Sequence, residues 1–599
     1  MTADVQLQER AATLFFERWQ EALTTAFPSH RARTVSASAA LDEALALADS
    51  FVRSGGVTRA SADPAESGHG VGMLPDVASE ALAILRNDPI LKKRFSARET
   101  VLAEAIERLK AKENVTTELV EQIRALVMSL RERYLEAGFD EAEKLVSEQP
   151  KHQGDIERLS GAIVSELRYQ GWSDEGLREA AQEALEQGPD KRSAIPYLRS
   201  RTLARDRSFV CFVSVELRGQ KLTFPDGQGL SLVETLPEAK RTGRTVKDGP
   251  QVKVSICAPD MAAAAGLAHR RVLSTLGAAT IFLPGAGIQV ASEVVAVEAE
   301  PGMLRAFAVQ ERLPEEKRRA SAEEITNILA SSWRASASPS ADPLHDAIRL
   351  RHRAMMAADA ESRLLLLWSG LERLTAGARG HGGALSAARE LTSRAVTLGK
   401  LRREIGDLTA VLEQEVAQDP PRQRDLLERV GSYSDVAGRV HLDRAKVLEL
   451  LLGSNEKLRE LLSVFYEDKP LLVWRFHALW KDLGEGDERK RGDSIAGYHE
   501  RSQERVSWQV ARIYRARNRI AHIGVGPERM RDLAWHAHFY LTQLVAICVH
   551  YSERGETRAQ DVLLRRAGQY DAMIKLLKAD DPIALSTDTL LRPVVLFQE

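Results

Sequence analysis

The chain has 599 residues, of which 44% are hydrophobic and 28% charged, and its formal net charge is -2 at pH 7. These values are ordinary for soluble globular protein, and the length suits about three or four domains. A net charge so close to zero excludes a global polycation, so a nucleic-acid site here must be a local basic patch. The cysteines, Cys211, Cys257 and Cys548, are far apart in apolar runs, which is typical of reduced core residues and forms no zinc spacing.

The N-terminus, "MTADVQLQERAATLFFERW", mixes charges of both signs and lacks the apolar segment of a signal peptide. No apolar run approaches the ~20 residues that span a bilayer. The sequence therefore predicts a cytoplasmic protein with no membrane partner.

Residues 1–204 are predicted to be helical. "AALDEALALADSFVRSG" and "ETVLAEAIERLKAKENVTTELVEQIRALVMSLRERYLEAG" repeat apolar residues at helical spacing. The Gly-, Ser- and Pro-rich stretch between them, "GGVTRASADPAESGHGVG", predicts a loop. We interpret this part as an N-terminal helical region and a candidate sensor or regulator.

Residues 205–333 are predicted to form a small β-rich domain. "SFVCFVSVELRG", "QVKVSICA" and "TIFLPGAGIQVASEVVAVEAE" have strand composition, and "DMAAAAGLAHRRVLSTLG" is the one helix-like insert. "FLPGAGIQV" lacks the Lys-Ser/Thr of a phosphate-binding loop, so a hairpin turn is the better interpretation. The segment "RASASPSADP", Arg334–Pro343, is the best linker candidate.

Residues 343–599 are predicted to form an all-helical bundle, in which "KDLGEGDERKRGD" is a solvated loop and "VSWQVARIYRARNRIAH" a helix. The predicted fold class is therefore mainly α. It combines an N-terminal helical region, a central small β-rich (α+β) domain and a C-terminal helical bundle.

The helix near residue 515 is unusually basic. No acidic residue occurs between Glu504 and Glu528, while five arginines do. Its apolar stripe is formed by Val506, Val510, Ile513, Tyr514 and Ile520. Arg517 falls on or beside that stripe, where burying a charge without a partner would cost free energy of folding. His522 follows, just before Gly524, Gly526 and Pro527 end the helix.

These residues offer what cleavage of RNA needs without a metal. A histidine in the last helical turn feels the negative end of the helix dipole, which favours its imidazolium form. Arg517 can bind a phosphate through two hydrogen bonds, and Asn518 can orient a neighbouring side chain. The ribose 2′-hydroxyl is an internal nucleophile, so the protein must only move protons, with His522, and stabilise the developing charge, with Arg517. Each role typically contributes ~100-fold or more. Arg512, Arg515 and Arg519 are predicted to bind the RNA.

The motif Arg517-Asn518-Arg-Ile-Ala-His522 resembles the R-x4–6-H motif of HEPN-domain ribonucleases, in which a polar residue often follows the arginine. Ala357–Leu374 resembles the opening helices of the Apea-like HEPN domains of prokaryotic antiviral proteins, with Glu372 at an acidic position common there. The resemblance covers roughly Pro343 to Ala579, under half the chain.

This resemblance implies a helical domain that forms a homodimer and brings two R-x4-H motifs into one endoribonuclease site. The site would use no metal and no cofactor and would leave 2′,3′-cyclic phosphate and 5′-hydroxyl ends. The biological role implied is that of a toxin-like effector of antiphage defence by abortive infection. Its substrate would be host or phage RNA, with tRNA as one candidate.

Several alternatives stay open. A second R-x4-H pattern, Arg531/His536, lies in a helix with a buried composition, so the first is preferred. Glu372 either pairs with a surface arginine or holds Arg517 or His522 in position, and Tyr514 either packs in the core, which we favour, or stacks on a base.

The main rival function is a non-catalytic module that binds RNA or protein, and a third hypothesis makes the bundle a scaffold and places the activity in the β domain. Because more than half of the chain lies outside the bundle, we also hypothesise that residues 1–334 sense a phage-derived or nucleic-acid trigger or hold the bundle inactive.

Overall fold

The computed structural model describes residues 3–23, 35–54, 73–148, 150–204, 207–218, 230–233, 241–242, 250–282, 287–298, 304–309, 342–357, 359–377, 383–416, 426–428, 430–434, 440–466, 468–523, 530–552, 558–579 and 587–591. These residues are mainly helical, with a six-stranded sheet in the middle of the chain and a two-stranded sheet further on. The predicted class, mainly α with a small α+β part, is confirmed. The predicted loop at 55–72, the turn at 283–286 and nearly all of the linker at 334–343 lie outside the described residues.

The N-terminal part folds into helices that share one core, whose largest fully buried side chains include Phe15, Trp19 and Phe139. Trp19 also donates its indole N–H to the carbonyl of Leu177 at 3.1 Å, which ties the first helix to a distant one. The helices are α1 (Ala3–Leu23), α2 (Ala37–Arg53), α3 (Leu74–Asn87), α4 (Pro89–Arg94), α5 (Ser96–Ala111), α6 (Thr117–Glu148), α7 (Gln153–Tyr169), α8 (Asp174–Gln187) and α9 (Lys191–Thr202).

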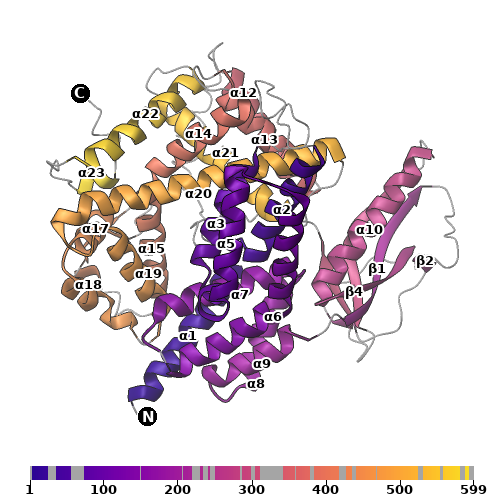
Figure 1. Cartoon of the computed structure of the whole chain (residues 1–599), viewed down its shortest axis with the longest axis horizontal. Coiled ribbons are helices and arrows are strands. Elements are labelled where there is room, and N and C mark those ends of the chain that lie inside the picture. The colour runs from indigo at the N-terminus through magenta and orange to yellow at the C-terminus, as the bar shows by residue number, and fades with distance from the viewer. Residues whose placement is uncertain are drawn as a thin grey trace.

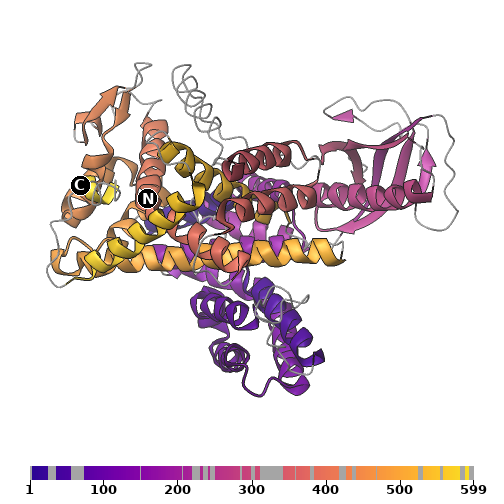
Figure 2. The ribbon, with the colours of Figure 1, turned by 90° about the horizontal axis from the view of Figure 1, so that it is seen from above.

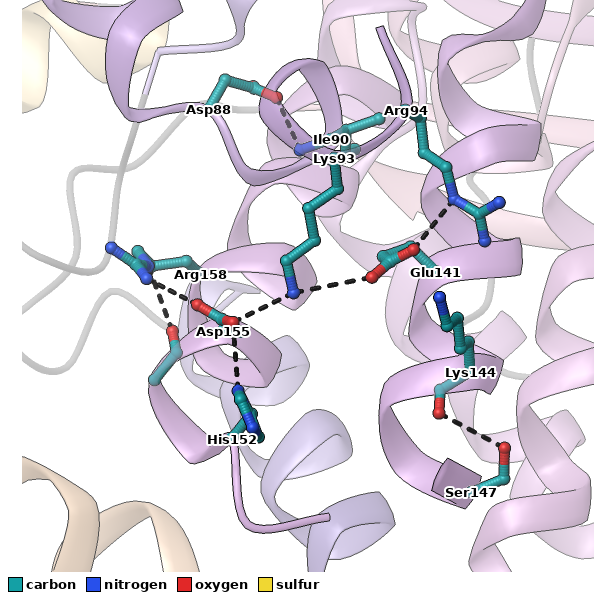
Figure 3. Close-up of polar contacts among 11 residues, drawn as sticks. Asp88, Ile90, Lys93, Arg94, Glu141, Lys144, Ser147, His152, Asp155 and Arg158 are labelled. Atoms are coloured by element: carbon teal, nitrogen blue, oxygen red, sulfur yellow. Dashed lines mark hydrogen bonds and ion pairs between the residues drawn. The ribbon is translucent and has the colours of Figure 1, made fainter. Parts of the chain in front are cut away.

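A network of charges joins α4 to α6 and α7 (Figure 3). Lys93 lies between two carboxylates, 3.5 Å from Glu141 and 3.0 Å from Asp155, and Arg94 contacts Glu141 at 2.9 Å. Burial acts to raise the pKa of Asp155, but Lys93 and Arg158 outweigh it, so that pKa is lowered. Glu141 is buried, whereas Lys93, Arg94 and Asp155 are partly exposed, so these pairs link three helices and each contributes modestly to stability.

The central sheet has the strand order β2-β4-β1-β5-β6-β3. All neighbouring strands are antiparallel except β3 and β6, which pair in parallel. Helix α10 (Met261–Phe282) packs on one face, where Val254, Val294 and Ala268 are fully buried. The sheet and α10 lie at one end of the molecule (Figures 1 and 2). The strands are β1 (Arg207–Arg218), β2 (Leu230–Val233), β3 (Arg241–Thr242), β4 (Gln251–Ala258), β5 (Gly287–Glu298) and β6 (Leu304–Ala308).

One predicted strand segment is wrong. Residues 280–282, expected to be extended, form the last turn of α10, and the strand begins only at Gly287. The apolar residues Ile281 and Phe282 suggested a strand, but they follow an established helix, which is extended more easily than it is nucleated. The segment 283–286 therefore joins a helix to a strand and not two strands.

The C-terminal part contains two cores. One lies around Trp368 and Tyr540, and the other around Phe465 and Phe476. The prediction of an all-helical bundle is wrong in one detail, because β7 (Ser432–Ser434) and β8 (Val440–Leu442) form an antiparallel pair. The helices are α12 (Asp342–Met356), α13 (Ala360–Thr375), α14 (Ala384–Leu398), α15 (Lys400–Val416), α17 (Arg444–Leu452), α18 (Asn455–Leu462), the 3-10 turn Ser463–Phe465, α19 (Pro470–Asp482), α20 (Glu488–Ile523), α21 (Met530–Ser552), α22 (Ala559–Leu577) and α23 (Thr587–Leu591).

Helix α20 is much longer than its predicted apolar stripe. It spans 36 residues, roughly 54 Å at helical rise, and runs along the helical body to α2 and α3 (Figures 1 and 2). The predicted loop over 481–493 is limited to 483–487, because Asp487 caps the helix by accepting the backbone N–H of Arg489 at 3.0 Å. Ile495 belongs to the second C-terminal core and Val510 to the first, so this one helix connects both.

The N-terminal helices pack directly on the C-terminal helices. Leu471 at the start of α19 joins the N-terminal core, and its backbone N–H donates to Glu17 of α1 at 2.9 Å. Arg475 of α19 forms an ion pair with Glu21, which also lies in α1. Burial raises the pKa of Glu17 to about 7, although the Leu471 hydrogen bond opposes this. In the part of the chain that the structure describes, no helix is long and apolar enough to cross a membrane.

Candidate functional site

The second half of α20 carries the predicted motif. Its apolar stripe is buried as expected, with Val510 and Ile513 fully buried and Ile520 9% exposed. Tyr514 is also buried, and its ring lies against Trp368 of α13, with 5.3 Å between ring centroids. Tyr514 therefore packs in the core in this structure, where it fixes the position of α20 against α13.

Arg517 lies half-buried at the edge of this stripe. Its Nη1 donates to Oδ1 of Asn518 at 2.8 Å, which is the polar neighbour that the sequence singled out. Within the described residues no carboxylate forms an ion pair with Arg517. Asn518 therefore orients the guanidinium group of Arg517, and no carboxylate of the described residues neutralises its charge. Such a guanidinium group is suited to binding an anion.

His522 lies in the last turn of α20, which ends at Ile523. Its side chain is outside the described residues, as is the glycine-containing segment 524–529. Residues five apart on a helix are separated by about 140° around the axis. Positions 517 and 522 therefore lie on different faces of α20.

Arg512 and Arg515 are placed quite differently. Nε of Arg512 lies 3.2 Å from Glu43, and its Nη2 lies 2.9 Å from Glu80. Arg515 contacts the other oxygen of Glu43 at 2.7 Å. The side chains of the two arginines are 13% and 11% exposed, so both are nearly buried beneath α2 and α3. These two predicted RNA-binding residues meet carboxylates of the N-terminal region, and only Arg519 of the predicted group is exposed.

The four charged groups form a buried, electrically balanced set. Burial acts to raise the pKa of Glu43, but Arg515 and Arg512 outweigh it and hold that pKa below its ordinary value. At Glu80 burial dominates, and the nearby charge of Glu43 adds to it, so the pKa of Glu80 is raised despite Arg512. The pKa of Arg512 is raised, since the two carboxylates outweigh its burial. Arg512 thus forms ion pairs with two carboxylates, and the charged form of Glu80 is stabilised less than that of Glu43.

Local sequence explains how these carboxylates are presented. Helix α2 begins after Ser36, whose hydroxyl accepts the backbone N–H of Ala39 at 3.0 Å. Leu41 and Ala44 face the N-terminal core and leave Glu43 at its edge. One turn before Glu80 in α3, Asp76 makes a two-pronged ion pair with Arg389 of α14, at 2.6 and 3.1 Å.

Glu372 is half-buried on α13, one turn after Trp368. Within the described residues its carboxylate forms no ion pair with Arg517. The predicted supporting role of Glu372 toward His522 rests on a side chain outside that part of the structure.

The second R-x4-H pattern is divided between two environments. Arg531 is exposed at the start of α21, while His536 is 7% exposed and packs between Trp535 and Tyr540. A histidine so enclosed is poorly placed to meet a polymer, which agrees with the preference for the first motif.

Sequence reasoning missed Glu43 and Glu80. Arg512 and Glu43 are 469 positions apart, so no local spacing or motif joins them. Helices α2 and α3, which carry Glu43 and Glu80, have ordinary amphipathic patterns, and only their packing on α20 shows what the two carboxylates contact. In the described part of the chain, no three His, Cys, Asp or Glu residues come together as a potential metal site.

Comparisons with models of known protein families, with curated proteins and with solved structures found no match. The HEPN resemblance therefore stays a prediction that rests on the motif and its flanking residues.

Proposed function

We propose that this protein is a metal-independent endoribonuclease of the HEPN type. The observation that carries the proposal is the state of Arg517, which is half-buried, directed by Asn518 at 2.8 Å and without a carboxylate partner in the described residues. It lies near the end of a basic helix whose last turn holds His522. A cation and a titratable imidazole are the two groups that cleavage by an internal nucleophile requires.

The reaction follows from these groups. A neutral His522 accepts the proton of a ribose 2′-hydroxyl, and the 2′-oxygen then attacks the adjacent phosphorus. The bond from phosphorus to the 5′-oxygen breaks, and this oxygen receives a proton from an imidazolium. Arg517 stabilises the charge that develops on the phosphoryl oxygens. The products are a 2′,3′-cyclic phosphate and a 5′-hydroxyl.

A homodimer through the C-terminal helices completes this proposal. One reaction needs a base and an acid, and a second copy of His522 supplies the other histidine. Positions 517 and 522 of one chain are about 140° apart around the helix axis, and a second chain offers another route by which a histidine can reach Arg517. The biological setting we propose is antiphage defence by a toxin-like effector in the cytoplasm, with tRNA among its substrates.

The test is cleavage of total bacterial RNA and tRNA in EDTA by the full-length protein and by His522→Ala. His352→Ala, which removes an exposed histidine of α12, is the matched control. We expect fragments ending in cyclic phosphate from the wild type and the control, and a loss of at least ~100-fold in His522→Ala.

Equal cleavage by all three proteins would place the activity elsewhere and refute the role of His522. RNA binding that survives in His522→Ala, with no cleavage by any of the proteins, would favour the non-catalytic RNA-binding module. Binding and cleavage are therefore both measured.

A further inference from the structure

Three arginines of α20 fall on one line that leads to position 522 and does not include Arg517. Arg512, Arg515, Arg519 and His522 are separated by three, four and three residues, which places them on one face of the helix. Arg519 is exposed, whereas Arg512 and Arg515 are covered by α2 and α3. The N-terminal helices thus cover the first two positions of this four-position line and leave Arg519 exposed.

The covering groups have the chemistry of the expected ligand. Arginine pairs with carboxylates and with phosphates through the same planar set of donors. Glu43 and Glu80 place carboxylate oxygens 2.7 to 3.2 Å from the guanidinium nitrogens of Arg512 and Arg515, the distance at which phosphate oxygens would lie.

We infer that Glu43 and Glu80 act as internal substitutes for RNA phosphates, and that α2 and α3 must leave α20 before an RNA backbone can follow Arg512, Arg515 and Arg519 to His522. This inference rests on the proposed function, since it names how access to that same site is regulated. The N-terminal region is then a competitor of RNA within the same chain. A trigger acts by shifting the equilibrium between covered and uncovered α20.

The energetics of the ion pairs between Glu43, Glu80 and the two arginines are compatible with reversible separation of α2 and α3 from α20. Buried ion pairs contribute little net stability, because desolvation offsets the attraction. The raised pKa of Glu80 has the same origin, since burial disfavours its charged form. A polyanion that offers several phosphates to the same arginines therefore competes with one carboxylate whose charged form is favoured there, Glu43, and one whose charged form is disfavoured by burial, Glu80.

The experiment measures binding of a single-stranded 2′-O-methyl oligoribonucleotide to the full-length protein. This probe has no free 2′-hydroxyl, so its binding does not depend on cleavage. The variant is the double change Glu43→Gln and Glu80→Gln, which keeps the side-chain shape and removes the charge. Asp76→Asn is the control, because it removes a carboxylate of α3 that contacts Arg389 of α14 and not the line on α20.

We expect the double variant to bind the probe about tenfold more tightly than the wild type, and Asp76→Asn to bind like the wild type. Two more arginines then contact phosphates, so the slope of log affinity against log salt becomes steeper by about 1.4 for a single strand. Adding Arg512→Ala and Arg515→Ala to the double variant should cancel both changes.

Unchanged affinity and slope in the double variant would overturn the inference, as would an equal gain in Asp76→Asn, which would show general loosening of the interface. The proposed function is tested separately by His522-dependent cleavage of natural RNA. A double variant that binds the probe tightly but cuts nothing would leave the inference standing and refute the nuclease.

Discussion

Two pairs of arginines on α20 differ sharply in their surroundings, although they lie within two helical turns. Arg512 and Arg515 are nearly buried and contact carboxylates of α2 and α3. Arg517 is half-buried beside Asn518, and Arg519 is exposed. The difference shows that a run of arginines is not one surface. Arg512 and Arg515 hold two regions of the chain together, whereas Arg517 and Arg519 make no such contact within the described part of the chain and are the pair we propose for the ligand.

The largest expected effect comes from removing a buried partner. Arg512→Met leaves Glu80 and part of Glu43 buried without their cation, which should lower the free energy of unfolding by about 3–5 kcal/mol. Urea unfolding followed by circular dichroism measures this, with Arg519→Met as the control. If Arg512→Met lowered the free energy of unfolding by less than about 1 kcal/mol, Arg512 would not be a buried partner of Glu43 and Glu80.

Next in size is the effect on cleavage. Arg517→Ala should reduce cleavage of RNA about 100-fold, because the charge of the transition state loses its stabilising cation. Arg531→Ala, in the second R-x4-H pattern, should change the rate less than about threefold, since the exposed Arg531 is separated from the enclosed His536. Rates from single-turnover assays on one RNA compare the two variants. The reverse ranking would move the site to α21.

The pH dependence of stability tests the other contact of the N-terminal helices. Burial raises the pKa of Glu17 from 4.5 to about 7, so between these values the folded protein binds more protons than the unfolded chain. Stability should therefore fall as pH rises from 4.5 to about 7 and then level off. Glu17→Gln should remove this part of the pH dependence of stability. The amide oxygen of glutamine can still accept the N–H of Leu471, but the side chain does not titrate.

Urea midpoints at pH 5, 6, 7 and 8 give the comparison for Glu17. Asp407, whose pKa burial raises to about 6, titrates in the same range in both proteins, so the difference between them isolates Glu17. The same pH profile in wild type and Glu17→Gln would show that this carboxyl group is not held near neutrality.

The smallest effect is expected at Arg519. Because Arg519 is exposed, Arg519→Ala should leave stability within about 0.5 kcal/mol of the wild type. If it contacts one phosphate, the salt slope of RNA binding should fall by about 0.7. Fluorescence anisotropy at several salt concentrations measures the slope. An unchanged slope would remove Arg519 from the RNA path.

Local pattern was enough to predict the fold class. The stripe of α20 was identified because helical spacing of Val510, Ile513 and Tyr514 reflects burial along one face. The same pattern did not show the start of α20, because Glu488–Asp493 is charged and is held in the helix by the cap at Asp487. Composition likewise suggested a strand at 280–282, where the preceding helix continues.

The partners of Arg512 and Arg515 could not be predicted in this way. Their carboxylates come from helices more than 400 positions away, and Glu43 lies on a helix with no unusual residue pattern. Only the three-dimensional packing decides which arginines of a basic run are enclosed. The catalytic roles of Arg517 and His522 stay predictions.

Helix α20 also limits how the chain can change during evolution. Its first half lies in one C-terminal core, at Tyr498, and its second half in the other, at Val506. One residue inserted or deleted between them would rotate the halves by about 100° and turn one apolar stripe out of its core. Related chains should therefore vary in length at the connections between helices and keep constant the number of residues between Tyr498 and Val506.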